Sequence, residues 1–211
     1  MNQRLIGILL ALLPGVIAHA QDFDGQAREI PQPDHLVPVA PYAPDFHREY
    51  LGLCHELLQV SERETAVMIY MPSFEPEEGL VLRETEGPEP RYELIATRAD
   101  RSIWYSMPKN NQEHKQRAVK VTRHRAPLPA DLARHVCRLW EAMLRGVRYP
   151  GPEMEGVAVD GATTEFRWRP PFGGTLHGET WSPTKGSPRH FVELGRSLIE
   201  YCDAAEAERA R

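Results

Sequence analysis

Short apolar segments separated by turn-forming residues fill the chain between residues 65 and 123. Each segment either alternates polar with apolar positions or is rich in β-branched and aromatic residues, which is typical of β-strands. Connections this short join antiparallel neighbours, because parallel strands need a crossover of a dozen or more residues. This part of the chain therefore predicts a mostly antiparallel sheet. The five expected strands cover residues 65–71, 80–85, 91–97, 103–107 and 117–123.

Apolar residues at helical spacing predict three helices around these strands. The first begins at Asp45, a residue type that is preferred at helix N-caps. The second covers residues 129–147 and carries one wide apolar stripe of the kind that packs on a sheet. The third begins with Ser187 as its cap and ends near Asp203, ahead of a charged tail over residues 204–211.

Further hairpins are expected between the second and third helices. Asp160-Gly161 predicts a two-residue turn between residues 157–159 and a strand from Ala162, because a type I′ turn needs positive φ at both central positions. A Pro-rich loop at 170–174 then separates two more segments with strand character. The order of elements predicts a single α+β domain over residues 45–203. We expect a mostly antiparallel sheet with two or three helices packed on one face.

The amino-terminal residues predict export from the cytoplasm. Residues 1–20 combine Arg4, an apolar run over 5–17 and the small-residue ending Ala18-His19-Ala20, a pattern typical of a secretory signal peptide cleaved near Ala20. As a helix, the apolar run would reach only about 20 Å, short of the roughly 30 Å of a hydrocarbon core. We therefore expect a periplasmic or secreted mature protein without a membrane span. Five prolines between residues 21 and 44 predict a Pro-rich extended arm over 21–44.

Charge is unevenly distributed along the chain, although the net charge is only −5. Residues 75–93 hold seven Glu against two Arg, whereas residues 98–125 hold eight Lys or Arg against two acidic residues. The basic block could form a patch for an anionic partner. We favour the alternative that acidic and basic strands pair across the antiparallel sheet. Nothing in this balance indicates a nucleic-acid-binding protein.

Three cysteines, Cys54, Cys137 and Cys202, each fall on the apolar stripe of a different expected helix. Exported chains meet oxidising conditions, so a disulfide among these three is one interpretation. The other is that all three are small buried hydrophobic side chains. An apolar stripe does not supply the partly exposed, positive surroundings that an activated thiolate needs, so no catalytic cysteine is expected.

No motif in the chain specifies a catalytic reaction, a metal or a cofactor. The nine histidines include no His-x-x-x-His pair, and no Cys-x-x-Cys occurs. Phosphate-binding and dinucleotide-binding glycine loops are also missing from the sequence, as is a Gly-x-Ser-x-Gly nucleophile elbow. We therefore expect no dedicated metal site and no cofactor.

The late hairpin carries the most informative polar residues. Its five-residue loop sets a register in which Phe166 lies opposite Gly178, and alternation then sorts the side chains onto two faces. Phe166 belongs to the expected core face. The opposite face could bind a polar or anionic group, or place Glu179 and His177 for acid–base chemistry. We favour a solvated strand face held by weak Glu–Arg pairs. Its residues are Glu165, Arg167, Arg169, His177, Glu179 and Trp181.

Export, small size and the missing catalytic motifs predict a non-enzymatic exported protein that binds another macromolecule, such as an inhibitor or immunity-type protein. The alternative is a small periplasmic hydrolase or ligand-binding protein that uses His177, Glu179 and Arg167. Geometry distinguishes the two hypotheses. An enzyme places these side chains in a concave pocket, whereas a binding module leaves them on a flat or convex face.

Overall fold

The computed structural model describes residues 34–39, 45–61, 64–85, 91–107, 118–149 and 160–210. All of them belong to the unit Pro31–Arg211. The predicted signal peptide lies outside the described residues, as do residues 21–33 and 40–44 of the predicted arm and residues 157–159 of the predicted hairpin. No helix among the described residues has the length and apolar character required to cross a membrane.

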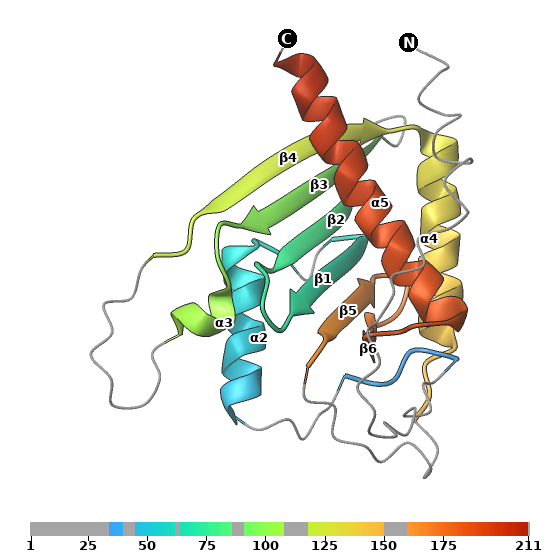
Figure 1. Cartoon of the computed structure of the whole chain (residues 1–211). Helices are drawn as coiled ribbons and strands as arrows, with labels where there is room; N and C mark the ends of the chain where they lie inside the picture. The colour runs from blue at the N-terminus through green and yellow to red at the C-terminus, as the bar shows by residue number, and fades with distance from the viewer. Residues whose placement is uncertain are drawn as a thin grey trace. The chain divides into compact units, whose positions relative to one another are not determined.

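The described residues form one antiparallel sheet of six strands in the order β4-β3-β2-β1-β5-β6 (Figure 1). This arrangement confirms the predicted α+β class and the antiparallel sheet. The strands are β1 (Ala66–Pro72), β2 (Glu78–Thr85), β3 (Arg91–Ala99), β4 (Val121–Leu128), β5 (Ala162–Trp168) and β6 (Leu176–Trp181). The helices are α2 (Asp45–Leu57), α3 (Ile103–Ser106), α4 (Ala130–Arg145) and α5 (Gly186–Arg209).

Helices pack on both faces of the sheet. The long helices α4 and α5 cover one face, as expected, and α5 runs obliquely across the strands (Figure 1). The first helix does not join them, because α2 packs with α3 on the opposite face. Side chains of β1 explain this division. Met68 belongs to the core under α4 and α5, whereas Val67 and Ile69 belong to the core under α2 and α3. A strand that is buried on both faces needs a cover on each.

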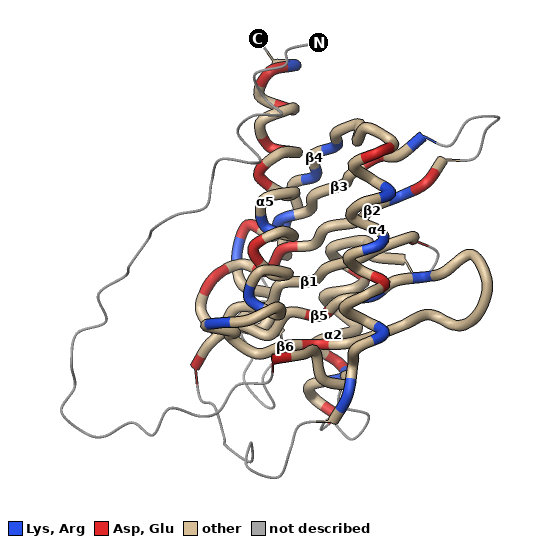
Figure 2. Tube along the Cα trace, turned by 90° about the vertical axis from the view of Figure 1, so that its right-hand side faces the viewer, with Lys and Arg blue, Asp and Glu red and all other residues tan. Residues whose placement is uncertain are grey.

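Two basic residues of the sheet pair with acidic residues on neighbouring strands, as the interpretation that we favoured expects; Lys109, Lys115 and Arg117 lie outside the described residues. Arg98 of β3 lies opposite Glu78 of β2, and its Nε donates to Glu78 Oε1 at 2.6 Å. Arg125 Nη1 of β4 lies 3.6 Å from Glu93 Oε2 of β3. Figure 2 shows Lys/Arg and Asp/Glu positions interspersed over β2, β3 and β4, whereas β1 carries neither. Opposite charges on neighbouring strands thus satisfy one another at these two positions.

The expected strand at residues 103–107 is wrong, because residues Ile103–Ser106 form the short helix α3. Ser102 caps this helix by accepting a hydrogen bond from the Tyr105 backbone N–H. The buried Glu77 carboxylate accepts from the N–H of Ile103 at 2.6 Å and from that of Trp104 at 3.1 Å. A buried carboxylate at a helix N-terminus satisfies donors that would otherwise be orphaned.

Two other elements are displaced from their expected positions. The strand expected at 117–123 is β4, Val121–Leu128, and it includes Pro127, which a strand at the edge of a sheet tolerates. The third helix continues to Arg209 instead of ending near Asp203. Its N-cap residue is Lys185, and Ser187 lies inside the first turn.

The described part of the arm lies against β6. Val37 pairs with Glu179 through two backbone hydrogen bonds of 2.9 and 2.8 Å, and the neighbouring Leu36 is fully buried in the α4–α5 core. Residues 36 and 37 therefore cover part of the outer edge of β6 and limit its availability for pairing with another chain.

Candidate functional site

The β5–β6 hairpin has the predicted register, with Phe166 opposite Gly178. Phe166 is fully buried in the α4–α5 core and stacks on Phe191 of α5. Gly178 is required by close packing, because an added Cβ would lie 2.7 Å from the Val147 side chain. The predicted core face of the hairpin is confirmed.

The opposite face is solvated only in part: Arg169, His177 and Trp181 are exposed, as we favoured, but Glu165 and Arg167 are buried. The side chains of Glu165 and Arg167 are 2% and 4% exposed, because α2 packs over this part of the sheet. His55, in the last turn of α2, reaches the strand and places its Nε2 at 2.9 Å from Glu165 Oε2. Sequence reasoning missed His55 because 110 residues separate it from Glu165.

Glu165 is the centre of a group of basic side chains, which we call the Glu165 cluster: His55, Glu165, Arg167 and His177. Arg167 Nε lies 3.4 Å from Glu165 Oε1, and His177 Nδ1 lies 4.0 Å from the same oxygen. Arg167 Nε and Nη2 are buried and make no hydrogen bond with any acceptor in the described part of the chain. The guanidinium of Arg167 therefore depends on its ion pair with Glu165 for compensation of its buried charge.

Of the other predicted patch residues, Glu179 lies beside this cluster, whereas Trp181 and Arg169 have other surroundings. Trp181 is partly exposed and packs on Gly161, where an added Cβ would lie 2.6 Å from the indole ring. Glu179 lies opposite Glu165 in the strand register, and its backbone pairs with Val37. Arg169 follows the end of β5 and lines a separate cleft beside α4. The structure thus brings together Glu165, Arg167 and His177, with His55 added.

A buried carboxylate next to a histidine could orient that histidine as a general base, but the cluster lacks an activated nucleophile. Cys54 is the neighbouring thiol on α2, and burial raises its pKa above the ordinary cysteine value, which favours the unreactive thiol form. Tyr50 is held by Glu77, and burial likewise raises its pKa above the usual tyrosine value. The geometry of the Glu165 cluster therefore indicates an electrostatic attachment of α2 to β5.

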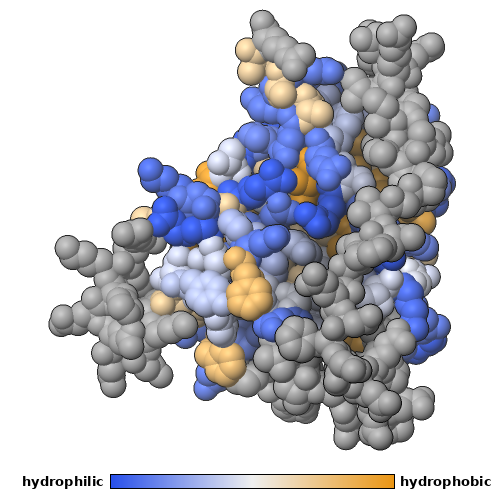
Figure 3. All heavy atoms as spheres, viewed as in Figure 1, coloured by the Kyte–Doolittle hydropathy of each residue, from blue (hydrophilic) through white to orange (hydrophobic). Residues whose placement is uncertain are grey.

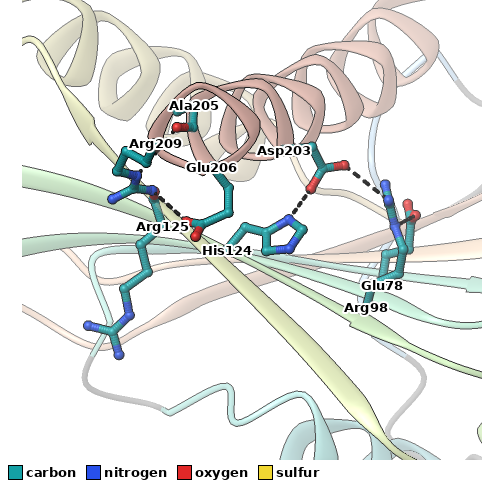
Figure 4. A network of polar contacts seen from close by, with 8 residues as sticks. All are labelled: Glu78, Arg98, His124, Arg125, Asp203, Ala205, Glu206 and Arg209. Atoms are coloured by element: carbon teal, nitrogen blue, oxygen red, sulfur yellow. Dashed lines mark hydrogen bonds and ion pairs between the residues drawn. The ribbon is translucent and has the colours of Figure 1, made fainter. Parts of the chain in front are cut away.

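A second polar network connects α5 to the edge of the sheet (Figure 4). The Asp203 carboxylate lies 2.7 Å from His124 Nδ1 and 3.0 Å from Arg98 Nη1. Further along α5, Arg209 bonds to the Arg125 carbonyl and lies 2.8 Å from Glu206. The adjoining cavity measures about 170 Å³, below the roughly 300–1,000 Å³ that is usual for a ligand site. These contacts explain why α5 continues beyond Asp203.

The cysteines are free thiols in the structure. Cys54 belongs to the core under α2, whereas Cys202 belongs to the core under α4 and α5. A bridge between these two would have to cross the sheet. Within the described residues, no group of three His, Cys, Asp or Glu side chains could hold a metal ion.

Helices α2 and α3 each carry one exposed aromatic ring. Phe46 and Tyr105 are 55% and 53% exposed. Phe46 packs edge-on against Trp104, with ring centroids 6.0 Å apart, and Trp104 packs in turn on Tyr50 at 5.0 Å. Figure 3 shows separate hydrophobic side chains standing on the face in view, below a band of hydrophilic side chains. We call the group Phe46, Trp104 and Tyr105 the aromatic surface.

Comparisons with known proteins add no relative. No protein-family model matches the chain, and searches of curated proteins and of solved structures find no match.

Proposed function

We propose that the protein is an exported, non-enzymatic binding protein that contacts another protein of the cell envelope through the aromatic surface. The amino-terminal sequence pattern supports export. The exposed, mutually packed rings of α2 and α3 support binding, since aromatic residues are enriched in the energetically dominant positions of protein interfaces.

Contacts within the protein itself hold the aromatic surface in place without a partner. Glu77 anchors both helices, because its carboxylate accepts hydrogen bonds from the Tyr50 hydroxyl at 2.7 Å and from the backbone of α3. Tyr50 then supports Trp104, and Trp104 supports Phe46. Rings that are already ordered lose little conformational freedom on association, which favours affinity.

The burial of Arg167 argues against the hydrolase alternative. That hypothesis needs His177, Glu179 and Arg167 in one open pocket, yet Arg167 is buried under α2 and makes an ion pair with Glu165. Neither the cavity beside Asp203 nor the cleft beside α4 is lined by His177 or Glu179. A binding role that uses another surface accounts better for this geometry.

Capture of envelope proteins by the tagged mature chain tests the proposal. We expect a Phe46→Ser/Tyr105→Ser variant to lose the captured protein, because two exposed interface aromatics are removed. A Tyr149→Ser/Phe172→Ser variant is the matched control, since it removes two aromatic residues that are 75% and 93% exposed elsewhere. A His177→Ala/Glu179→Ala variant should also retain the partner. Equal capture by all variants, or loss only in the His177/Glu179 variant, would refute the proposal.

A further inference from the structure

A cleft of about 420 Å³ lies beside α4, at the end of the sheet where β2 and β5 finish. Its volume falls in the range of roughly 300–1,000 Å³ that small-molecule sites usually occupy. The cleft is separate from the aromatic surface and from the Glu165 cluster, because none of their residues lines it. A ligand in this cleft would therefore leave the aromatic surface free.

Positive charge predominates among the lining residues. Three guanidinium groups, those of Arg134, Arg138 and Arg169, face a single carboxylate, Glu84. Arg134 makes an ion pair with Asp131, one turn earlier in α4. Arg138 and Arg169 have no ion-pair partner within the described residues. Arginine side chains offer paired N–H groups that match the oxygens of carboxylates and phosphates.

The cleft also holds a buried donor that lacks an acceptor. Trp168 is 5% exposed and lines the cleft, and its Nε1 makes no hydrogen bond within the described part of the structure. The other buried indole, Trp140, donates its Nε1–H to the Val67 carbonyl at 3.2 Å. Buried polar groups normally find a partner, so the unsatisfied indole N–H of this lining residue is a donor that a ligand of the cleft could satisfy.

Apolar walls complete the cleft. The rings of Tyr92, Trp168, Pro170 and Pro171 line it together with the Cys137 thiol. Burial raises the pKa of Cys137 to about 11, so this thiol stays protonated and uncharged at neutral pH. These walls suit a flat apolar body, whereas the arginines suit charged oxygens at its ends.

From this combination we propose that the cleft binds a small organic anion with an aromatic body. Arg134 is compensated by Asp131, so Arg138 and Arg169 against Glu84 leave a net positive charge that matches an anionic ligand. Arg138 and Arg169 hold its anionic oxygens, and the indole N–H of Trp168 donates to one of its acceptor atoms. Carboxylate and phosphate share this chemistry, so the test includes both.

Titration of the full mature chain, followed through the Trp168 indole N–H resonance in proton–nitrogen NMR spectra, tests the proposal. A Trp168→Phe variant assigns that resonance. The probes are terephthalate, phenyl phosphate, the neutral terephthalamide and inorganic phosphate. We expect terephthalate or phenyl phosphate to shift the resonance saturably, and the tighter of the two identifies the anionic group. Terephthalamide and inorganic phosphate should bind at least tenfold more weakly, since each lacks either the charge or the apolar body.

Arginine variants decide whether the cleft is the site. Arg138→Gln and Arg169→Gln should each weaken binding about 10- to 100-fold, as expected for loss of one charge-assisted hydrogen bond. Both residues are exposed, so neither change should affect folding. Arg145→Gln, on the same helix but outside the cleft, is the matched control and should leave affinity within about twofold. The proposal is overturned if neither aromatic anion binds, if terephthalamide or inorganic phosphate binds equally well, or if the cleft variants bind like the control.

Discussion

Removal of the Arg167 charge should strongly destabilise the fold without a comparable effect on any surface function. Arg167 and Glu165 are both buried, and their side-chain atoms approach to 3.4 Å. The substitution Arg167→Met retains much of the apolar volume but leaves the Glu165 carboxylate without its buried counter-charge. Breaking a buried pair from one side typically costs about 3–5 kcal/mol. Since domains of ordinary stability have only about 5–15 kcal/mol in total, a loss of this size is easily measured.

The paired substitution separates electrostatics from packing. Replacing both partners by apolar residues, as in Glu165→Leu/Arg167→Met, removes both buried charges and is often neutral or stabilising relative to the intact pair. We therefore expect the double variant to recover at least about 2 kcal/mol relative to Arg167→Met. Recovery should be incomplete, because His55 loses its contact with the Glu165 carboxylate.

Urea denaturation at pH 7, followed by far-ultraviolet circular dichroism, measures these free energies. The four proteins of the cycle are the unchanged chain, the two single variants and the double variant. Additive effects of the two substitutions would refute the reasoning, as would a cost below about 1 kcal/mol for Arg167→Met. Either result would mean that the Glu165 carboxylate and the Arg167 guanidinium are not coupled in a buried pair.

Three other predictions concern the packing of α5, the anchoring of its end and the buried thiols. Gly195→Ala should destabilise by about 1–2 kcal/mol in thermal or urea unfolding, because the added Cβ would overlap the Met68 sulfur and this strain exceeds the gain in helix propensity. Met68→Ala is itself destabilising, but in that background Gly195→Ala should no longer lower stability; an unchanged cost would contradict the packing argument. Asp203→Asn should speed hydrogen exchange in the last turns of α5 by weakening the contacts to His124 and Arg98, whereas unchanged exchange would show that the network does not hold the helix. Burial raises the pKa of Cys137 to about 11 and that of Cys202 to about 12. The stability that these two buried thiols contribute is therefore complete below the unfolded cysteine pKa of about 8.5, and it is lost as pH rises through 11 and 12. The urea midpoint should accordingly fall between pH 8 and pH 10.5, and by less in a Cys137→Ala/Cys202→Ala variant; an equal fall in both proteins would contradict this cause.

The hairpin could be predicted in detail because its information is local. Residues 164–180 hold both strands, their loop and the Gly178 that packing requires, so alternation specifies which side chains share a face. What covers each face is not local information. His55 and α2 bury Glu165 from a distant part of the sequence, which is why a face with several charged residues was expected to be solvated.

The apolar sequence of β1 contains information about both faces of the sheet that the sequence prediction did not use. Residues on both of its faces are buried, a pattern that indicates helices on both sides of a sheet. The first helix could have been placed opposite the other two on this basis. The helix α3 was harder to predict, because its aromatic residues favour strands and its stability depends on Glu77, 26 residues before Ile103.

Contacts between residues that are far apart in the sequence also explain the length of α5. Residues after Asp203 are mostly charged or small, which suggested a tail. In the fold, Arg209 reaches the Arg125 carbonyl of β4, and Tyr201 donates to the Pro127 carbonyl at 3.0 Å. Partners on the edge strand thus stabilise a segment that has little apolar surface of its own.

Hydrogen–deuterium exchange of the mature chain, alone and with the envelope protein that it captures, most directly tests whether the aromatic surface is where the protein works. We expect slower exchange in Asp45–Leu57 and Ile103–Ser106 on binding, with β5 and β6 unchanged. Protection confined to β5 and β6, with α2 and α3 unaffected, would contradict the proposed binding surface and return the Glu165 cluster to consideration as the functional site.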